Sequence, residues 1–200
     1  TAEYQTALDV VVDHVNQISI LICNSTILSK NRVDFYFISI GEPFPSPGYF
    51  KNEICQPSLR CIQLAHLPSA YEEHTLQALY QYCQMATPHN NSTQTRVTYL
   101  HSKGTFHPTP NQEAWRTSLT TAALHDDCLA PPASSNNSCN VCGESFQPTP
   151  LRMAGNMFTA SCDYVRKLVP PLSFERQMSQ AADRARLLWR DPAMNFTSQI

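Results

Sequence analysis

Hydrophobic and polar positions change period several times along the chain. The first segment places apolar residues three and four positions apart, which is the spacing of one helical face; they are Tyr4, Leu8, Val11, Val12, Val15 and Ile18. Residues 32–40, RVDFYFISI, are almost continuously apolar, as in a strand covered on both faces. Residues 41–50 contain three prolines and two glycines. Because proline has no amide proton for a sheet ladder, this stretch predicts a loop.

A second strand, a helix and a third strand follow this loop. Residues 59–67, LRCIQLAHL, have strand character. Ser69 and Glu72 then have the spacing of a capping box, in which each side chain satisfies a backbone donor of the other residue. The helix that this box begins has its apolar residues at Leu76, Leu79, Tyr80 and Cys83. The polar residues 87–94 end it, and residues 96–102, RVTYLHS, are the third predicted strand.

The second half begins with another capped helix. Thr109 and Gln112 repeat the capping-box spacing, and Pro110 suits the first helical position. The predicted buried face of this helix consists of Trp115, Leu119, Ala122 and Ala123. Residues 130–150 have no periodicity, four prolines and a C-x-x-C, which indicates an excursion. Residues 155–168 predict a short strand or turn that passes into a helix. A last helix, at 173–189, is predicted to bury Met178, Ala181, Ala182, Ala185 and Leu188.

Strands that alternate with helices predict the fold class. The order favours an α/β domain in which a mostly parallel sheet, GT-A-like or Rossmann-like, is flanked by helices. We expect a single domain over residues 1–200 with a Cys- and Pro-rich excursion at 130–150. In such sheets ligands bind beyond the carboxyl ends of the strands. Tyr99 and Leu100 are then expected inside the sheet, and the residues after them at its edge.

Charge, cysteines and glycosylation sequons bear on partners and compartment. The net charge is −2 and no basic block occurs, which argues against nucleic acid as a partner. No apolar run is expected to reach the roughly 20 residues of a membrane helix. We therefore expect membrane attachment only through an anchor outside this chain, which starts at Thr1. Eight cysteines and N-x-S/T sequons together favour the secretory pathway, in the Golgi or ER lumen or outside the cell; the sequons are Asn24, Asn90, Asn91, Asn136 and Asn195.

Four cysteines gather around the excursion and admit three interpretations; they are Cys128, Cys139, Cys142 and Cys162. Two disulfides that pin the 130–150 loop are favoured in a secretory setting. A four-thiolate zinc site is the second interpretation, although zinc ribbons usually contain two C-x-x-C pairs. A redox role for the C-N-V-C motif is the third. The remaining cysteines, at 23, 55, 61 and 83, are expected to pair among themselves, or, for Cys61 and Cys83, to pack as small apolar residues.

The third predicted strand ends in His101, Ser102, Lys103 and Gly104. A lysine at a strand end presents a point charge with three donors, which suits a phosphate group. Gly104 permits a close turn of the backbone, and exposed amides there can add an anion-binding nest. The G-x-x-x-x-G-K pattern of a Walker loop is absent. A solvated strand-to-loop turn with a capping lysine is the alternative.

Three segments together resemble a known group of proteins. They are RVTYLHSKG, the WR pair Trp115–Arg116, and GNMFTASCDYVRKLVPP, within about residues 95–178. The order is similar to glycosyltransferase-like proteins with Y-(L/I/M)-H-(S/T/N)-K-(G/S), then a W-R helix, then G-N-(F/M)-(F/W)-x-A. Rhamnan-synthesis and capsular-polysaccharide transferases carry related H-T-K motifs, and algal and other eukaryotic secretory members look closest. This resemblance covers less than half of the chain.

The resemblance implies a GT-A-type domain that uses a nucleotide-activated sugar and a carbohydrate or glycoprotein acceptor. It places His101, Ser102 and Lys103 at the donor side of the sheet edge, and Gly155 and Asn156 at the acceptor or sugar pocket. Many such enzymes hold a divalent metal through a D-x-D motif, which is absent here; the nearest acidic pair is Asp126–Asp127. Either Lys103 replaces the metal or the chain is not an active transferase. A nucleotide-binding first strand is also expected to be missing.

The chemistry of sugar transfer assigns roles to these residues. The departing diphosphate needs positive charge or a metal, and Lys103 can provide the charge. The acceptor hydroxyl benefits from a general base, for which His101 ranks before Asp163 and Glu175. Glu175 lies in the first turn of the last predicted helix, where the helix dipole alone favours a carboxylate. The rival interpretation is a secreted carbohydrate- or protein-binding module that retains the fold without catalysis.

Overall fold

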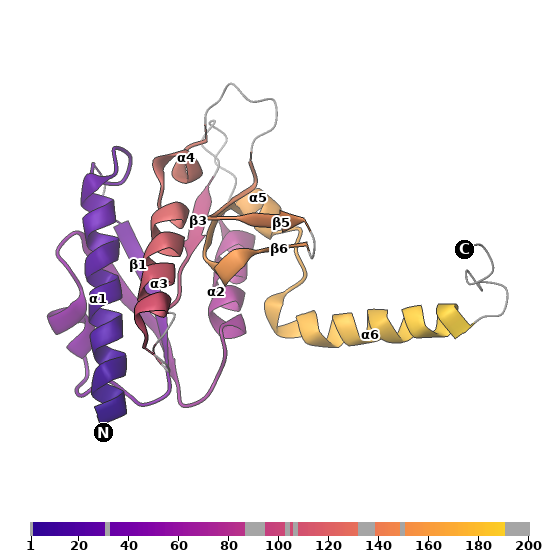
Figure 1. Cartoon of the computed structure of the whole chain (residues 1–200), viewed down its shortest axis with the longest axis horizontal. Helices are drawn as coiled ribbons and strands as arrows, with labels where there is room; N and C mark the ends of the chain where they lie inside the picture. The colour runs from indigo at the N-terminus through magenta and orange to yellow at the C-terminus, as the bar shows by residue number, and fades with distance from the viewer. Residues whose placement is uncertain are drawn as a thin grey trace.

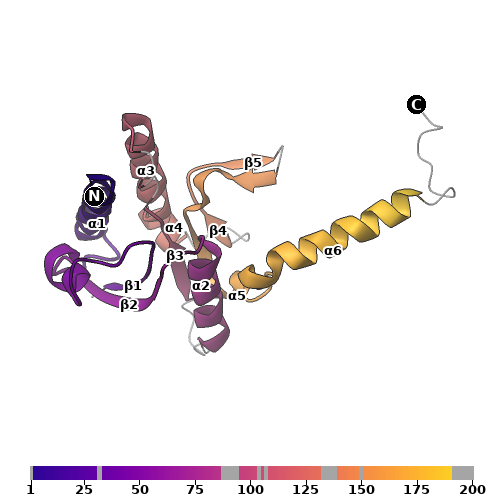
Figure 2. The same cartoon turned by 90° about the horizontal axis from the view of Figure 1, so that it is seen from below.

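The computed structural model describes residues 2–30, 33–86, 95–102, 105, 108–131, 139–148 and 151–190 (Figures 1 and 2). Its elements in chain order are α1 (Ala2–Asn24), β1 (Val33–Ile40), the π-helix η1 (Phe50–Ile54), β2 (Leu59–Leu67), α2 (Glu73–Met85), β3 (Arg96–Tyr99), α3 (Pro110–Ala123), α4 (Asp126–Leu129), β4 (Val141–Cys142), β5 (Phe146–Pro148), β6 (Leu151–Met153), the 3₁₀ turn η2 (Ala154–Asn156), β7 (Phe158–Ser161), α5 (Cys162–Val165) and α6 (Pro171–Arg190). The protein is therefore a mixed α/β structure.

The described strands form three small sheets. β1 and β2 pair in parallel, with Val33 opposite Leu59. β7 is the middle strand of the second sheet and is antiparallel to both β3 and β4, while β5 and β6 form an antiparallel pair. The prediction of a mostly parallel sheet was thus wrong for the described strands, because three of the four pairings are antiparallel. A sequence pattern shows that a strand exists but not its direction, which depends on the path of the chain between strands.

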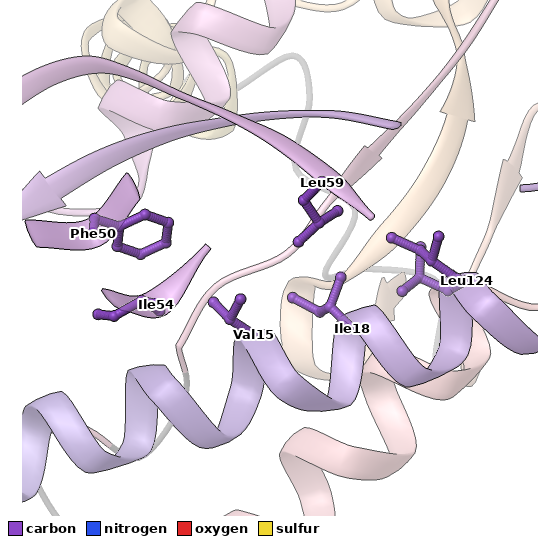
Figure 3. Packing of buried hydrophobic residues seen from close by; sticks show 7 residues of the cluster. Val15, Ile18, Phe50, Ile54, Leu59 and Leu124 are labelled. Carbon is purple, nitrogen blue, oxygen red and sulfur yellow. The ribbon is translucent and has the colours of Figure 1, made fainter. Parts of the chain in front are cut away.

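The largest apolar core lies between α1 and the β1–β2 sheet (Figure 3). The predicted stripe on the first helix is confirmed here, since Leu8, Val15 and Ile18 are buried. The buried residues of this core are Val15, Ile18, Ile22, Phe50, Ile54, Leu59 and Leu124. The Pro-rich loop and η1 cover this sheet and bring Phe50 into a stack with Phe37, at 4.0 Å between ring centroids.

Helix α1 is also long and apolar enough, over Glu3–Asn24, to cross a membrane by length and composition. The expectation that no segment reaches this length was therefore wrong. A buried core helix and an N-terminal signal sequence have the same signature. In this structure the apolar face of α1 supplies the largest core, and Ile20 on the helix is exposed.

Two smaller cores flank β7. One contains Cys83, Ala160, Cys162 and Val165, and it joins α2 and α5 to the sheet. The other contains Leu119, Ala123 and Met157, and it holds α3 against β7. Leu100, just after β3, packs against both this cluster and the largest core. The end of β3 is therefore fixed where the cores meet.

Three disulfides cross-link the structure, in a pattern that differs from the predicted one. Cys128 pairs with Cys142, so one bond pins the base of the excursion as expected. Cys162, however, pairs with Cys83, and Cys55 pairs with Cys61. Cys23 and Cys139 are free and exposed. Two disulfides at the excursion, a four-thiolate zinc site and unpaired core roles for Cys61 and Cys83 are therefore ruled out in this structure, because the chain path brings α2 rather than Cys139 beside Cys162.

Several predictions about helices can be compared with the structure. The side chain of Thr109 accepts a hydrogen bond from the Gln112 amide, which confirms the cap of α3. Trp115 is 45% exposed and Arg116 is buried instead, so the predicted inner face of α3 was wrong at Trp115. The helix α6 extends away from the rest of the protein and its residues Phe174 to Leu187 are all exposed (Figures 1 and 2). The predicted burial of its face at Met178, Ala181, Ala182 and Ala185 was also wrong.

Candidate functional site

The two motif segments of the sequence meet at the end of β3. Nε2 of His101 lies 3.1 Å from the backbone oxygen of Gly155. Since a carbonyl oxygen only accepts, Nε2 must carry the hydrogen, which leaves Nδ1 of the neutral ring able to take up a proton. The ring of His101 also stacks on that of Tyr99, with centroids 6.1 Å apart. The structure thus brings His101 and Gly155 together and holds the imidazole in one orientation.

Gly155 and Asn156 shape the opposite side of this site. Both have positive φ, +80° at Gly155 and +58° at Asn156, and both lie in η2 just before β7. A Cβ at position 155 would lie 2.3 Å from Cδ1 of the buried Leu119. Only glycine therefore fits here while α3 packs so closely, and the tight turn directs Asn156 towards Glu72.

Glu72 joins the two sides of the site. Its Oε1 accepts a hydrogen bond from Nδ2 of Asn156 at 3.0 Å, and its Oε2 accepts one from the Tyr99 hydroxyl at 3.3 Å. Burial raises the pKa of Tyr99, and the negative charge of Glu72 raises it further. The phenol thus stays protonated and keeps donating to the carboxylate. The site consists of Glu72, Tyr99, His101, Gly155 and Asn156, which we call the β3 rim.

The sequence analysis assigned Glu72 a different role. It predicted a capping box with Ser69, but Glu72 is itself the N-cap of α2 and makes no side-chain capping bond. Its carboxylate instead points to the end of β3. One signal could have indicated this role, because Glu72 follows the carboxyl end of β2, a parallel strand, and ligand-facing groups gather there in α/β sheets.

A buried polar cluster lies behind the β3 rim, between α1 and α3. Nε2 of His14 lies 2.9 Å from the Thr120 hydroxyl, which itself donates to the Arg116 backbone oxygen at 2.8 Å. Because that hydroxyl has one hydrogen, His14 must be the donor in their bond, so its Nε2 carries the proton. The buried Arg116 forms an ion pair with Asp13 at 2.8 Å. These contacts tie α1 to α3.

The buried position of His14 makes the stability depend on pH. Desolvation is the main cause that lowers the pKa of His14 to about 4; the charges of Arg116 and His101 act in the same direction, whereas Asp13 opposes them. The unfolded chain therefore binds a proton near pH 6.5 that the folded protein refuses until about pH 4. We expect the His14 contribution to be intact above pH 6.5 and to fall by about 3 kcal/mol as the pH drops towards 4.

Urea denaturation at several pH values tests this expectation. The difference in free energy of unfolding between the wild type and His14→Gln is expected to shrink as the pH falls from 7 to 4. The exposed His66 provides the matched variant His66→Gln, for which the difference is expected to stay constant. A pH-independent difference for His14→Gln as well would contradict the assignment.

Other predicted site residues do not join the β3 rim or lie outside the described residues. Ser102 is half-buried next to His101, while Lys103 and Gly104 are outside the described residues. Glu175 is exposed on α6, which extends away from β3 (Figure 1), so the structure does not bring it to this site. Asp163 forms an ion pair with Arg166 at 2.5 Å. Among the sequons, Asn24 is exposed at the end of α1, and the other four are outside the described ranges.

The acidic pair after α3 has a structural role. The carboxylate of Asp126 accepts hydrogen bonds from the hydroxyls of Ser25 and Thr26, both at 2.5 Å, and from the Thr26 amide. These bonds, the Ser25 one first, lower the pKa of Asp126. Within the described part of the chain, no three His, Cys, Asp or Glu side chains gather as metal ligands would. Asp126 thus ties the end of α1 to α4.

The arrangement of the β3 rim permits general acid–base chemistry. An imidazole with a free Nδ1 and a carboxylate with two donors lie at the same strand end. A family model described as Domain of unknown function (DUF8361) matches residues 2–199. The chain belongs to this family. The DUF8361 match spans every residue of the β3 rim and of the buried polar cluster. No curated protein and no solved structure matches the chain.

Proposed function

We propose that the chain is a glycosyltransferase-like domain, of GT-A type, that transfers a sugar from a nucleotide-activated donor to a carbohydrate or glycoprotein acceptor. The contact between His101 and Gly155 carries the proposal, since these residues come from the first and third motifs of the resemblance. The two residues are 54 positions apart in the sequence, so their contact supports a site to which both motifs contribute.

In this proposal His101 is the general base. Its Nε2–H is held by the Gly155 carbonyl, so Nδ1 takes the proton of the acceptor hydroxyl as that oxygen attacks the sugar carbon. The bond from that carbon to the diphosphate breaks in the same step, and the diphosphate leaves with the electron pair. Lys103, two residues beyond His101 in the sequence, is proposed to offset the charge of the leaving group.

Glu72 and Asn156 are proposed to bind sugar hydroxyls. The amide of Asn156 has donor and acceptor atoms beyond its bond to Glu72, and the Glu72 carboxylate has lone pairs beyond those used by Tyr99 and Asn156. Groups of this kind bind the adjacent hydroxyls of a sugar. A divalent metal is left open in this proposal, because a donor diphosphate can itself supply most of the oxygen ligands.

The secretory compartment is the second part of the proposal. The three disulfides fit a secreted protein, because such bonds persist in oxidising compartments. The exposed sequon at Asn24 is accessible to glycosylation there. We propose the lumen of the Golgi or ER, where nucleotide sugars are present together with glycoprotein acceptors.

A thermal-shift screen against UDP-, GDP- and dTDP-sugars, with and without Mn²⁺, tests the function. At least one nucleotide sugar is expected to raise the melting temperature by several degrees at 100-fold excess over its Kd, which corresponds to about 2.7 kcal/mol of linkage. Lys103→Ala is expected to abolish the shift. Lys51→Ala, at an exposed lysine on η1, is the matched control and should retain it.

The same screen separates the rival function, a non-catalytic binding module. The lack of a D-x-D motif favours this rival. A module of that kind would bind glycans on an array but give no shift with any nucleotide sugar. Absence of a shift would therefore reject the transferase, and a shift that persists in Lys103→Ala would reject the role of Lys103.

A further inference from the structure

Helix α6 is a long element with little support from the rest of the protein. It spans Pro171–Arg190 and extends outward from α2 as a separate arm (Figures 1 and 2). Its first turn is tied down, for example by the Leu172 amide, which donates to the side chain of Gln77 at 3.3 Å. From Phe174 to Leu187 all residues are exposed.

One side of this arm is nevertheless apolar. Phe174, Met178, Ala181 and Ala185 recur at helical spacing and form a continuous line, which we call the α6 stripe. Phe174 is 54% exposed and Met178 is 52% exposed. An isolated helix of this length is marginal in water, and most helices depend on packing of their apolar face. The stripe therefore indicates that α6 packs against another surface.

The order of large and small side chains along the stripe points to a second copy of this chain. The large residues, Phe174 and Met178, occupy its amino-terminal half, and the small residues, Ala181 and Ala185, its carboxyl-terminal half. In an antiparallel pair, Phe174 lies opposite Ala185 of the other helix and Met178 lies opposite Ala181. Every layer then joins one large and one small side chain, as close packing requires.

The charges beside the stripe favour the same arrangement. Glu175 and Arg186 lie on the same flank of the stripe near its opposite ends. Antiparallel pairing brings Glu175 of each helix towards Arg186 of the other, which gives two opposite-charge contacts by symmetry. A parallel pair would keep these two residues at opposite ends of the interface, so they could not meet. A membrane surface fits less well, because half of the stripe is alanine and the arm carries both Glu175 and Asp183.

We propose that α6 mediates a two-fold symmetric dimer in which the α6 stripes of two copies pack antiparallel. The contact is isologous, so each substitution in the stripe changes the interface twice. The proposal concerns assembly and does not depend on the proposed enzymatic activity.

Sedimentation velocity over a concentration series, on the whole chain, tests the dimer. Met178→Asp is expected to raise its dissociation constant at least about 100-fold, because two unpaired charges enter an apolar interface. Leu187→Asp is the matched control, since Leu187 is 68% exposed on the opposite side of the same helix. It loses a comparable apolar side chain and should change the constant by less than about threefold. Circular dichroism confirms that both variants keep α6 helical.

A charge exchange tests the antiparallel direction. Glu175→Arg and Arg186→Glu alone are each expected to weaken the dimer several-fold, and the double variant to restore it. A wild-type chain that is monomeric at all concentrations would overturn the proposal. So would a dimer that Met178→Asp leaves intact, which would place the interface elsewhere, or a monomer whose α6 binds anionic phosphatidylserine vesicles in a flotation assay.

Discussion

Replacement of Cys83 and Cys162 by alanine is expected to lower the free energy of unfolding by about 4.5 kcal/mol, because the bond closes a loop of 79 residues and thereby restricts the unfolded chain. Both cysteines are almost fully buried in the core that joins α2 and α5 to β7. The covalent bond therefore holds together elements that are far apart in the sequence. Urea denaturation of the oxidised wild type and of the double variant, with a check that the m-value is retained, measures the effect.

The Cys55–Cys61 bond provides the matched control for this experiment. It spans only 6 residues, so the same chain-entropy argument gives about 2.4 kcal/mol for its removal. Cys23→Ala, at an exposed free thiol, should change stability by less than about 0.5 kcal/mol. An equal loss for the two disulfides would show that loop length does not govern their effects. No loss at all on removal of Cys83–Cys162 would contradict the pairing itself.

Gly155→Ala is the second substitution with a large expected effect, a loss of about 4 kcal/mol in the free energy of unfolding. The new Cβ would lie 2.3 Å from Cδ1 and 2.6 Å from Cδ2 of Leu119, and Leu119 is fully buried. Overpacking of this kind costs about 1–3 kcal/mol. The positive φ of +80° adds roughly 1 kcal/mol, because alanine tolerates that region poorly.

Two further variants separate the steric and backbone contributions. Gly41 has a positive φ of +100°, and a Cβ added there would meet no atom within 4 Å, so Gly41→Ala measures the backbone cost alone, about 1 kcal/mol. In a Leu119→Ala background the cost of Gly155→Ala is expected to fall towards the same value, since the clashing atoms are gone. An unchanged cost in that background would show that Leu119 does not limit position 155.

The β3 rim was accessible from the sequence only in part. His101 attracted attention as a polar residue at the end of an apolar strand, and Gly155 and Asn156 through the third motif. Glu72 was assigned to a cap, because its spacing from Ser69 is a local pattern, whereas its bonds to Tyr99 and Asn156 depend on how β2 and β3 are placed. Local spacing cannot distinguish a capping carboxylate from one that faces a site.

The sequence by itself determined the features that depend on neighbours along the chain. The stripe of α1 follows from helical spacing, and the cap at Thr109 follows from a side chain and an amide three residues apart. The tertiary structure alone decided strand direction, the pairing of Cys83 with Cys162, and the burial of Arg116 rather than Trp115. These features depend on contacts between residues far apart in the sequence, whose relative positions are fixed only when the cores pack and the chain path between them is set.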